Sequence, residues 1–370
     1  MKTQKLFQGD AADFTAGILK ETGAKNILLA CGRHSFDKLG LAEKFAKLPA
    51  NFIRFSDFSE NPTYEMVLKG LAVFRENKAE LILAIGGGSA IDVAKCIKIF
   101  APLKPGADYL AEEFQTSNTP LAAIPTTAGT GSEATHFAVI YKDGQKHSVS
   151  HECLRPDFAC LDEKLLATLP AYTKKSALLD ALSQAIESWW SVRVNETSQN
   201  FSKAAIEGIA KNAANYLAGD KAAAREILFA AHKAGEAINI TTTTAAHAMS
   251  YKLTSLYHIA HGHAVAVCLP FVWAQMLKAD ENKCIRPGGL NSLKNTFAEI
   301  AAALGTNSPE AAIKNWRDKL KKLGLNYPKI NESEIAALVG SVNPQRLGNN
   351  PIAFGAADLE EIYRDIGKSK

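Results

Sequence analysis

Four of the chain's nine histidines lie within residues 247–270. Upstream, Asp180 and Gln184 are four residues apart in a segment with helical spacing, so both face the same side of a helix. Carboxylate and imidazole groups are common ligands of Fe²⁺ and Zn²⁺. Asp180, Gln184, His247 and His261 are therefore candidate ligands of a divalent ion that would polarise a carbonyl during hydride transfer.

Each of these residues also has a simpler interpretation. A single aspartate on an alanine-rich helix is usually solvated, and a lone glutamine usually lies at the surface. His258, His261 and His263 could together form no more than a polar loop. The residue types alone leave these alternatives open.

A glycine-rich turn follows a predicted strand and begins a predicted helix; it consists of Gly86, Gly87, Gly88 and Ser89. Backbone N–H groups in such a turn can approach a phosphate, and the helix N-terminus favours negative charge. Asp92, in the first helical turn, could cap the helix or bind a ribose or nicotinamide. An ordinary strand-to-helix turn is the alternative.

Residues 125–133 form a second such element after another predicted strand, and its hydroxyl groups could hold the other side of a nucleotide. They belong to Thr126, Thr127, Thr130 and Ser132. Simple helix capping would also explain them. Two such turns about 40 residues apart in one region favour dinucleotide binding.

The end of the predicted strand 24–32 bears on the choice of cofactor. Enzymes that select NAD usually place a carboxylate at such a strand end, and residues 31–35 contain none. Gly32 leaves room for a 2′-phosphate, which Arg33 or Ser35 could bind. The segment favours NADPH over NADH.

The hydrophobic pattern predicts two domains. Buried strands are expected at 24–32, 79–88 and 120–127, with a helix over 62–74; this alternation indicates a parallel sheet covered by helices. After residues 169–170 the chain becomes alanine-rich and helical in period, with helices predicted at 173–192, 199–217, 220–238, 243–257, 264–278, 291–304 and 309–323. We expect an α/β dinucleotide-binding domain at 1–165 and an all-helical metal and substrate domain at 166–370.

Composition excludes several functions. The net charge is +4 and the basic residues are scattered, which argues against nucleic-acid binding. No apolar run approaches the roughly 18 residues that a membrane span needs, and the first residues do not resemble a signal peptide. The six cysteines form no CxxC pair, which favours free thiols and a cytoplasmic location.

Four motifs occur together and in order: GGGSAIDVAK (86–95), PTTAGTGSEAT (125–135), DALSQAIES (180–188) and HAMSYKLTSLYHIAHGHAVAVCLP (247–270). They resemble the iron-containing (group III) alcohol dehydrogenase family over nearly the whole chain. The resemblance implies a dehydroquinate synthase-like arrangement, with an α/β dinucleotide domain, a helical domain and a divalent metal, Fe²⁺ or Zn²⁺, in the cleft between them. It also implies NADPH or NADH as cofactor and a homodimer or larger assembly.

By position, Asp180, His247 and His261 match three of the family's metal ligands. The fourth ligand is usually a histidine, and this chain has Gln184, whose carbonyl oxygen binds metals more weakly. Tyr251 stands where many members have histidine; it could relay a proton or line the pocket.

Within the family, the 247–270 segment and NPQRLGNNP (343–351) resemble the phosphonoacetaldehyde reductases. That branch implies NAD(P)H-dependent reduction of phosphonoacetaldehyde to 2-hydroxyethylphosphonate. Lys252, His263 and Arg346 are candidate phosphonate-binding residues, since cationic donors recognise oxyanions. Ordinary surface charge and packing are the alternatives for these side chains.

Three other functions remain open. The first is a broad reductase or dehydrogenase of short-chain aldehydes and alcohols. The second is another reaction on the same scaffold, such as a sugar-phosphate dehydrogenase or a dehydroquinate synthase-like lyase. The third is a non-catalytic descendant with a decayed metal site, which Gln184 suggests.

Overall fold

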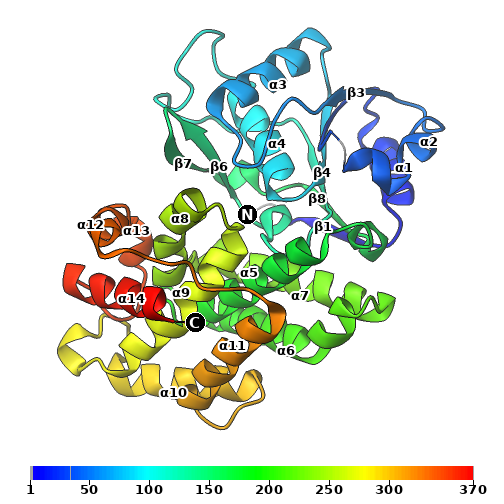
Figure 1. The fold of residues 1–370 in the computed structure, drawn as a ribbon. Coiled ribbons are helices and arrows are strands. Elements are labelled where there is room, and N and C mark those ends of the chain that lie inside the picture. Colours follow the sequence, from blue (N-terminus) through cyan, green and yellow to red (C-terminus); the bar gives the residue numbers. More distant parts are fainter. Residues whose placement is uncertain (1–2, 34, 370) are drawn as a thin grey trace. The chain divides into compact units, whose positions relative to one another are not determined.

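The computed structural model describes residues 3–33 and 35–369. The chain divides into two compact units, Met1–Leu169 and Pro170–Lys370. The first unit combines strands and helices, and the second is built of helices (Figure 1).

The first unit contains a six-stranded parallel sheet in the order β1-β8-β5-β4-β2-β3. Its strands are β1 (Lys5–Gln8), β2 (Asn26–Cys31), β3 (Asn51–Phe55), β4 (Leu81–Gly86), β5 (Leu121–Pro125) and β8 (Phe158–Leu161). The predicted parallel sheet with flanking helices is confirmed. A separate antiparallel hairpin, β6 (Phe137–Lys142) and β7 (Gln145–Ser150), accompanies it.

Alternation of side chains along the central strands creates two cores, one on each face of the sheet. Leu28 and Ile82 pack with α3 (Tyr64–Glu76) and α4 (Gly88–Phe100). Their strand neighbours Leu29 and Leu83 pack on the opposite face. That face is covered by α1 (Ala11–Thr22) and α2 (Ala42–Phe45). Burial on both faces explains why β2 and β4 read as continuous apolar runs.

The sequence pattern did not predict β1, β3, β8 or the β6–β7 hairpin. All four residues of β1 are exposed, and β3 has a single fully buried residue, Phe55. Both strands lie at the edges of the sheet. Edge strands need not bury both faces, so they lack the apolar runs that mark β2, β4 and β5.

The helices of the second unit are α5 (Ala171–Trp190), α6 (Glu196–Leu217), α7 (Lys221–Thr241), α8 (Ala245–Tyr257), α9 (His261–Leu277), α10 (Gly289–Ala303), α11 (Pro309–Leu323), α12 (Glu332–Gly340), α13 (Pro344–Leu347) and α14 (Ala356–Lys368). The expectation of a helical second half is confirmed. Helix α5 is central: it packs against α6, α7 and α9, and α8 packs against α9. This packing brings distant parts of the sequence to one side of α5.

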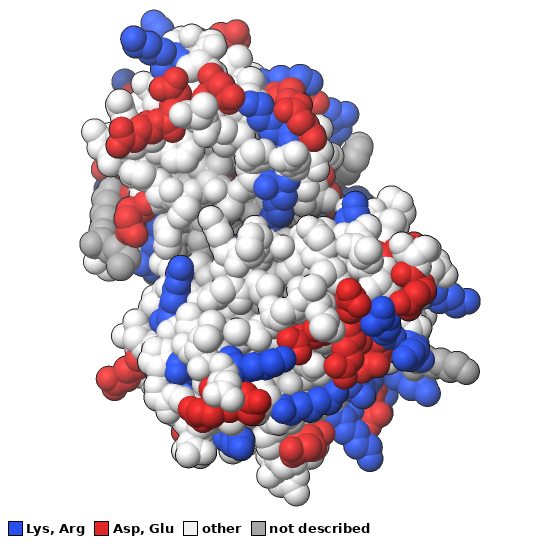
Figure 2. Space-filling view, turned by 90° about the vertical axis from the view of Figure 1, so that its left-hand side faces the viewer, with Lys and Arg blue, Asp and Glu red and all other residues white. Residues whose placement is uncertain are grey.

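Acidic and basic side chains are interspersed on the face shown in Figure 2. Exposed ion pairs, such as Lys278 with Glu361 at 2.9 Å, contribute to this mixture. Within the described residues, no helix combines the length and apolar character that crossing a membrane requires.

Candidate metal centre and nucleotide-binding turns

Helix α5 buries three polar side chains that share one of its faces. Asp180, Gln184 and Glu187 follow at spacings of four and three residues, and they are 3%, 4% and 0% exposed. Burying carboxylates is costly unless each has a partner. The partners come from α8 and α9.

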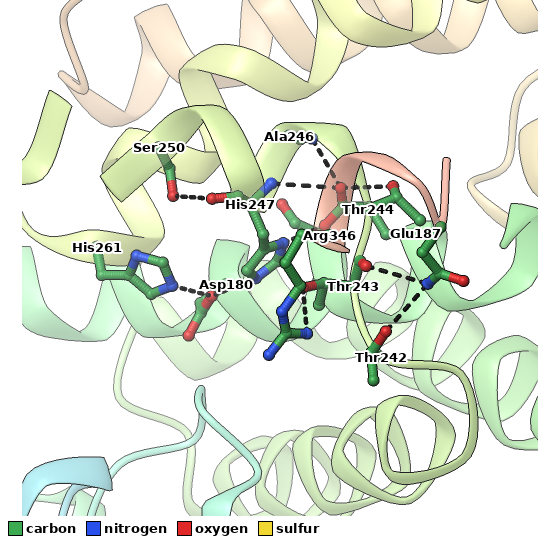
Figure 3. Close-up of polar contacts among 12 residues, drawn as sticks. Asp180, Glu187, Thr242, Thr243, Thr244, Ala246, His247, Ser250, His261 and Arg346 are labelled. Atoms are coloured by element: carbon green, nitrogen blue, oxygen red, sulfur yellow. Dashed lines mark hydrogen bonds and ion pairs between the residues drawn. The ribbon is translucent and has the colours of Figure 1, made fainter. Parts of the chain in front are cut away.

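Three potential ligands converge from three helices. His247 Nε2 from α8 lies 3.3 Å from Asp180 Oδ1, and His261 Nε2 from α9 lies 3.9 Å from the same oxygen. The three ligand atoms lie within 4.8 Å of one another. Figure 3 shows both imidazoles directed toward Asp180.

Gly262 allows α9 to approach α5 this closely. A Cβ atom at position 262 would lie 2.2 Å from the Ser176 carbonyl oxygen and 2.7 Å from the Asp180 Cβ. The His263 N–H also donates to Ser176 Oγ at 3.1 Å. The absent side chain at position 262 therefore sets the distance between His261 and Asp180.

Glu187 orients His247 by contacting the ring nitrogen that faces away from Asp180. Its Oε1 accepts hydrogen bonds from Thr244 Oγ1 (2.7 Å) and Ala246 N–H (2.8 Å), and its Oε2 faces Nδ1 of His247 directly. A histidine that donates Nδ1–H to a carboxylate presents its Nε2 lone pair on the opposite side. Glu187 was not among the predicted site residues, although it lies within the DALSQAIES motif, three residues after Gln184.

The charges of this group favour a cation. Burial alone would lower the pKa of His247, but Glu187 and Asp180 raise it to about 9. Burial also opposes ionisation of Asp180, yet its histidine neighbours hold its pKa below the ordinary value. Positive charge is therefore stabilised between the two carboxylates.

The donor atoms also fit a metal ion. Asp180 Oδ1 and His247 Nε2 are buried, and neither has a well-aligned hydrogen-bond partner within the part of the chain that the structure describes. Buried polar atoms rarely stay unsatisfied, and a divalent cation would satisfy both. Among the described residues, this is the one group of three or more His, Cys, Asp or Glu side chains close enough to share an ion.

Two further residues extend the group. Gln184 lies one turn after Asp180, and its amide is among the groups that hold the pKa of that carboxylate below its ordinary value. Tyr251 lies one turn after His247 on α8, and its ring stacks on His261 with centroids 5.8 Å apart. Both positions are within the predicted site.

Arg346, on α13, reaches the segment that leads into α8. Its Nη1 donates to Thr243 Oγ1 at 2.9 Å, four residues before His247 (Figure 3). The neighbouring Thr242 has a positive φ of 60°, which a β-branched residue rarely adopts. Asn349 holds this backbone in place, since its side-chain amide donates to Thr241 O, Thr242 Oγ1 and Thr243 O.

The structure does not bring the other two phosphonate candidates into this group. Lys252 is exposed and lies five residues after His247, about 140° away around the helix axis. His263 is buried, with Nδ1 bonded to the Tyr172 hydroxyl and Nε2 to the Asn326 carbonyl, both at 3.0 Å. Burial lowers the pKa of His263. It is therefore a neutral packing residue here.

In the first unit, the two glycine-rich turns lie side by side at the ends of β4 and β5. The Thr126 N–H donates to Gly86 O at 3.0 Å. A Cβ at Gly87 or Gly88 would meet Thr127 at 3.3 Å or Thr130 at 3.0 Å. The N-cap residue of α4 is Gly87, which has no side chain to cap the helix. Its backbone N–H groups therefore suit a phosphate.

Asp92 is not the N-cap of α4, since that position is Gly87, and its carboxylate turns toward the second glycine-rich turn. Its carboxylate accepts hydrogen bonds from Ser132 Oγ at 2.7 Å and Val139 N–H at 3.1 Å. Lys95, fully buried, donates to Ser132 Oγ, Thr135 Oγ1 and the Phe137 carbonyl. Burial lowers the pKa of Lys95 to about 8. These hydrogen bonds connect the second glycine-rich turn, residues 125–133, to α4.

The segment after β2 keeps Gly32 close to a serine. A Cβ at position 32 would lie 2.2 Å from Ser35 Oγ, and Arg33 forms a long, exposed ion pair with Asp57 at 3.7 Å. His34, between them, lies outside the described residues.

Comparison with known proteins identifies the fold and its chemistry. Residues 3–163 match the family model described as iron-containing alcohol dehydrogenase, and residues 175–367 match its C-terminal counterpart. The chain belongs to the iron-containing alcohol dehydrogenase family. It is therefore an oxidoreductase that interconverts alcohols and aldehydes, and the alternative of a non-catalytic descendant is not supported.

Individual members of this family are similar along most of the chain. An NADPH-dependent butanol dehydrogenase from Clostridium saccharobutylicum is 31% identical, over 94% of this chain and 93% of its own. A phosphonoacetaldehyde reductase from Streptomyces viridochromogenes is 34% identical, over 80% of this chain and 77% of its own. The crystal structure of a sulfoacetaldehyde reductase from Bifidobacterium kashiwanohense in complex with NAD⁺ has a TM-score of 0.89 and 25% identity, covering 100% and 98%.

Replacing Gln184 with histidine tests whether position 184 faces the ion. We expect Gln184→His to bind Zn²⁺ about 10- to 100-fold more tightly, because imidazole is a stronger ligand than a carboxamide oxygen. Competition with a chromophoric chelator measures the change. Gln275→His, on α9 and outside the site, is the control. Equal affinities for Gln184→His and the wild type would place residue 184 outside the coordination shell.

Proposed function

We propose that this family member uses NADPH to reduce phosphonoacetaldehyde to 2-hydroxyethylphosphonate. The observation that carries the proposal is the hydrogen bond from Arg346 to Thr243. It holds the guanidinium beside the N-terminus of α8, the helix that contains His247. Two of the similar proteins are named for aldehydes that carry an oxyanion, phosphonoacetaldehyde and sulfoacetaldehyde. A guanidinium can bind such an oxyanion through two parallel hydrogen bonds, that is, in a bidentate manner.

The residues that would hold the cofactors follow from the geometry of each unit. Asp180, His247 and His261, with Gln184 as a weaker fourth ligand, would bind Fe²⁺ or Zn²⁺. The turns 86–89 and 126–132 would bind the pyrophosphate and ribose of the dinucleotide. Arg33 or Ser35, beside Gly32, would bind a 2′-phosphate. When bound, the metal supplies Lewis-acid polarisation of the carbonyl and NADPH supplies the hydride.

The side chains of the helical unit have separate tasks in this proposal. Glu187 holds the His247 ring in its ligating orientation. Arg346 binds the phosphonate and so orients the aldehyde, while Thr243 fixes the guanidinium. Tyr251, stacked on His261, is placed to donate a proton to the product oxygen directly or through water.

Substituting Arg346 tests whether this residue recognises the phosphonate, because its effect on kcat/KM can be compared between a phosphonate substrate and a neutral one. We expect Arg346→Gln to lower kcat/KM for phosphonoacetaldehyde about 10- to 100-fold, because a hydrogen bond between charged groups contributes roughly 1.5–3 kcal/mol. The value for butanal should change less than about twofold. NADPH oxidation at 340 nm measures both.

Lys252→Gln is the matched control for this experiment, because Lys252 is a cation at an exposed position on α8. It should leave both substrates nearly unaffected. Equal losses for phosphonoacetaldehyde and butanal in Arg346→Gln would show that Arg346 supports the fold of the site and does not recognise the phosphonate.

The second candidate is a broad reductase of short-chain aldehydes. It is favoured by the similarity to a butanol dehydrogenase over nearly the whole of both chains. A wild-type enzyme with higher kcat/KM for butanal than for phosphonoacetaldehyde would support this candidate. The same assay therefore decides between the two substrates.

A further inference from the structure

A pocket of about 320 Å³ in the first unit, with both polar and apolar lining, contains a cysteine and a histidine that the proposed reaction does not use. Cys153 and His151 line it together with Thr116, Ser117 and Asn118. His151 precedes the short 3₁₀ helix Glu152–Leu154, between β7 and β8. Cys153 is partly exposed there.

The imidazole and the thiol are in direct contact. His151 Nδ1 lies 3.1 Å from Cys153 Sγ, and the same nitrogen accepts the Cys153 backbone N–H at 3.2 Å. Because Nδ1 accepts that N–H, it is unprotonated, and its single lone pair is shared between the Cys153 N–H and the thiol. Helix capping explains the backbone contact, but it does not require the thiol to lie beside the ring.

The other cysteines provide contrasts. Burial raises the pKa of four thiols, those of Cys31, Cys96, Cys160 and Cys268. Cys284 is partly exposed like Cys153, but no histidine hydrogen-bonds to it within the described residues. A metal at Cys153 would also need a third ligand, and the described residues offer such a group only around Asp180.

We propose that Cys153 is a thiol-exchange site that forms mixed disulfides with low-molecular-weight disulfides, with His151 as its base. The thiol proton passes to His151 Nδ1, which then no longer accepts the Cys153 N–H, and the Cys153 sulfur attacks one sulfur of the reagent RS–SR. The reagent's S–S bond breaks as the new Cys153–SR bond forms, and RS⁻ leaves and takes up the proton. The reagent is thus the oxidant, and its departing half is reduced to a thiol.

The pocket accommodates the part of the reagent that stays attached. Thr116, Ser117 and Asn118 provide hydroxyl and amide groups to a small peptide-like adduct. The short helix that carries Cys153 also packs against α4, the helix that begins at the first glycine-rich turn. An adduct on Cys153 therefore lies close to the element proposed to bind the dinucleotide.

Timed reaction of the full-length protein with glutathione disulfide at pH 7, followed by peptide mass spectrometry, tests this site. We expect Cys153 to form the mixed disulfide at least about tenfold faster than Cys284, because His151 Nδ1 lies within reach to take up the thiol proton during the attack. Dithiothreitol should remove the adduct.

His151→Asn is the informative variant, since asparagine can still accept the Cys153 N–H but is not a base. It should slow the reaction of Cys153 about tenfold and leave that of Cys284 unchanged, with the melting temperature near that of the wild type. The proposal is overturned if Cys153 reacts no faster than Cys284, or if His151→Asn reacts at the wild-type rate. These rates do not depend on which aldehyde the enzyme reduces.

Discussion

Replacing Gly262 with alanine is expected to destroy the metal centre while most of the helical unit remains folded. The new Cβ would fall 2.2 Å from a backbone oxygen of α5, that of Ser176, and neither helix can yield without moving. Displacement of α9 carries His261 away from Asp180. We expect Zn²⁺ affinity to fall more than about 100-fold and kcat to fall about 1000-fold, as for loss of a ligand.

Gly340→Ala is the control for this substitution. Gly340 is also helical, and a Cβ there would meet no described atom within 4 Å. It should bind Zn²⁺ and turn over like the wild type. Calorimetric titration with Zn²⁺ and circular dichroism distinguish loss of the site from loss of the fold. Wild-type affinity in Gly262→Ala would mean that the α5–α9 spacing does not control the centre.

The second large effect is expected for Asp180→Asn, which changes charge but hardly changes shape. The carboxylate is 3% exposed and is the common neighbour of His247 and His261. Asparagine has no negative charge, so the metal ion would keep the two imidazoles but lose the carboxylate ligand beside them. We expect at least a 100-fold loss of metal affinity and about a 1000-fold loss of kcat.

Elemental analysis after dialysis, together with NADPH oxidation, measures the effect of Asp180→Asn. Asp318→Asn, at an exposed position on α11, should keep both the metal and the activity. NADPH affinity, followed by fluorescence, should be unchanged in both variants because the proposed nucleotide turns belong to the other unit. Full metal content in Asp180→Asn would remove this residue from the ligand set.

The hydrophobic period and the glycine-rich motifs predicted the sheet, the helical half and the principal helices, because buried strands and amphipathic helices leave strong local patterns. Edge strands such as β1 were missed, since an exposed strand has no such pattern. The spacing of Asp180 and Gln184 indicated a shared helical face. That His247 and His261 would meet it depended on helix packing, which a single sequence does not show locally.

Residues that act through other residues were the hardest to predict. Glu187 touches the proposed ligand His247 and is not itself in the predicted set. The role of Gly262 is visible only once the Ser176 backbone is placed against it. Conversely, Lys252 was grouped with the site because it is near in sequence, whereas the helix turns it toward solvent.

The amide of Asn349 holds the strained Thr242 backbone from which the His247 helix starts. Asn349 lies near the end of the chain, more than 100 residues after the turn that it stabilises. During translation, the emerging polypeptide can build α5 to α9 well before this asparagine leaves the ribosome. We therefore expect the turn before the proposed ligand His247 to be fixed only after α5 to α9 have formed, and a chain truncated before Asn349 would have these helices without that restraint.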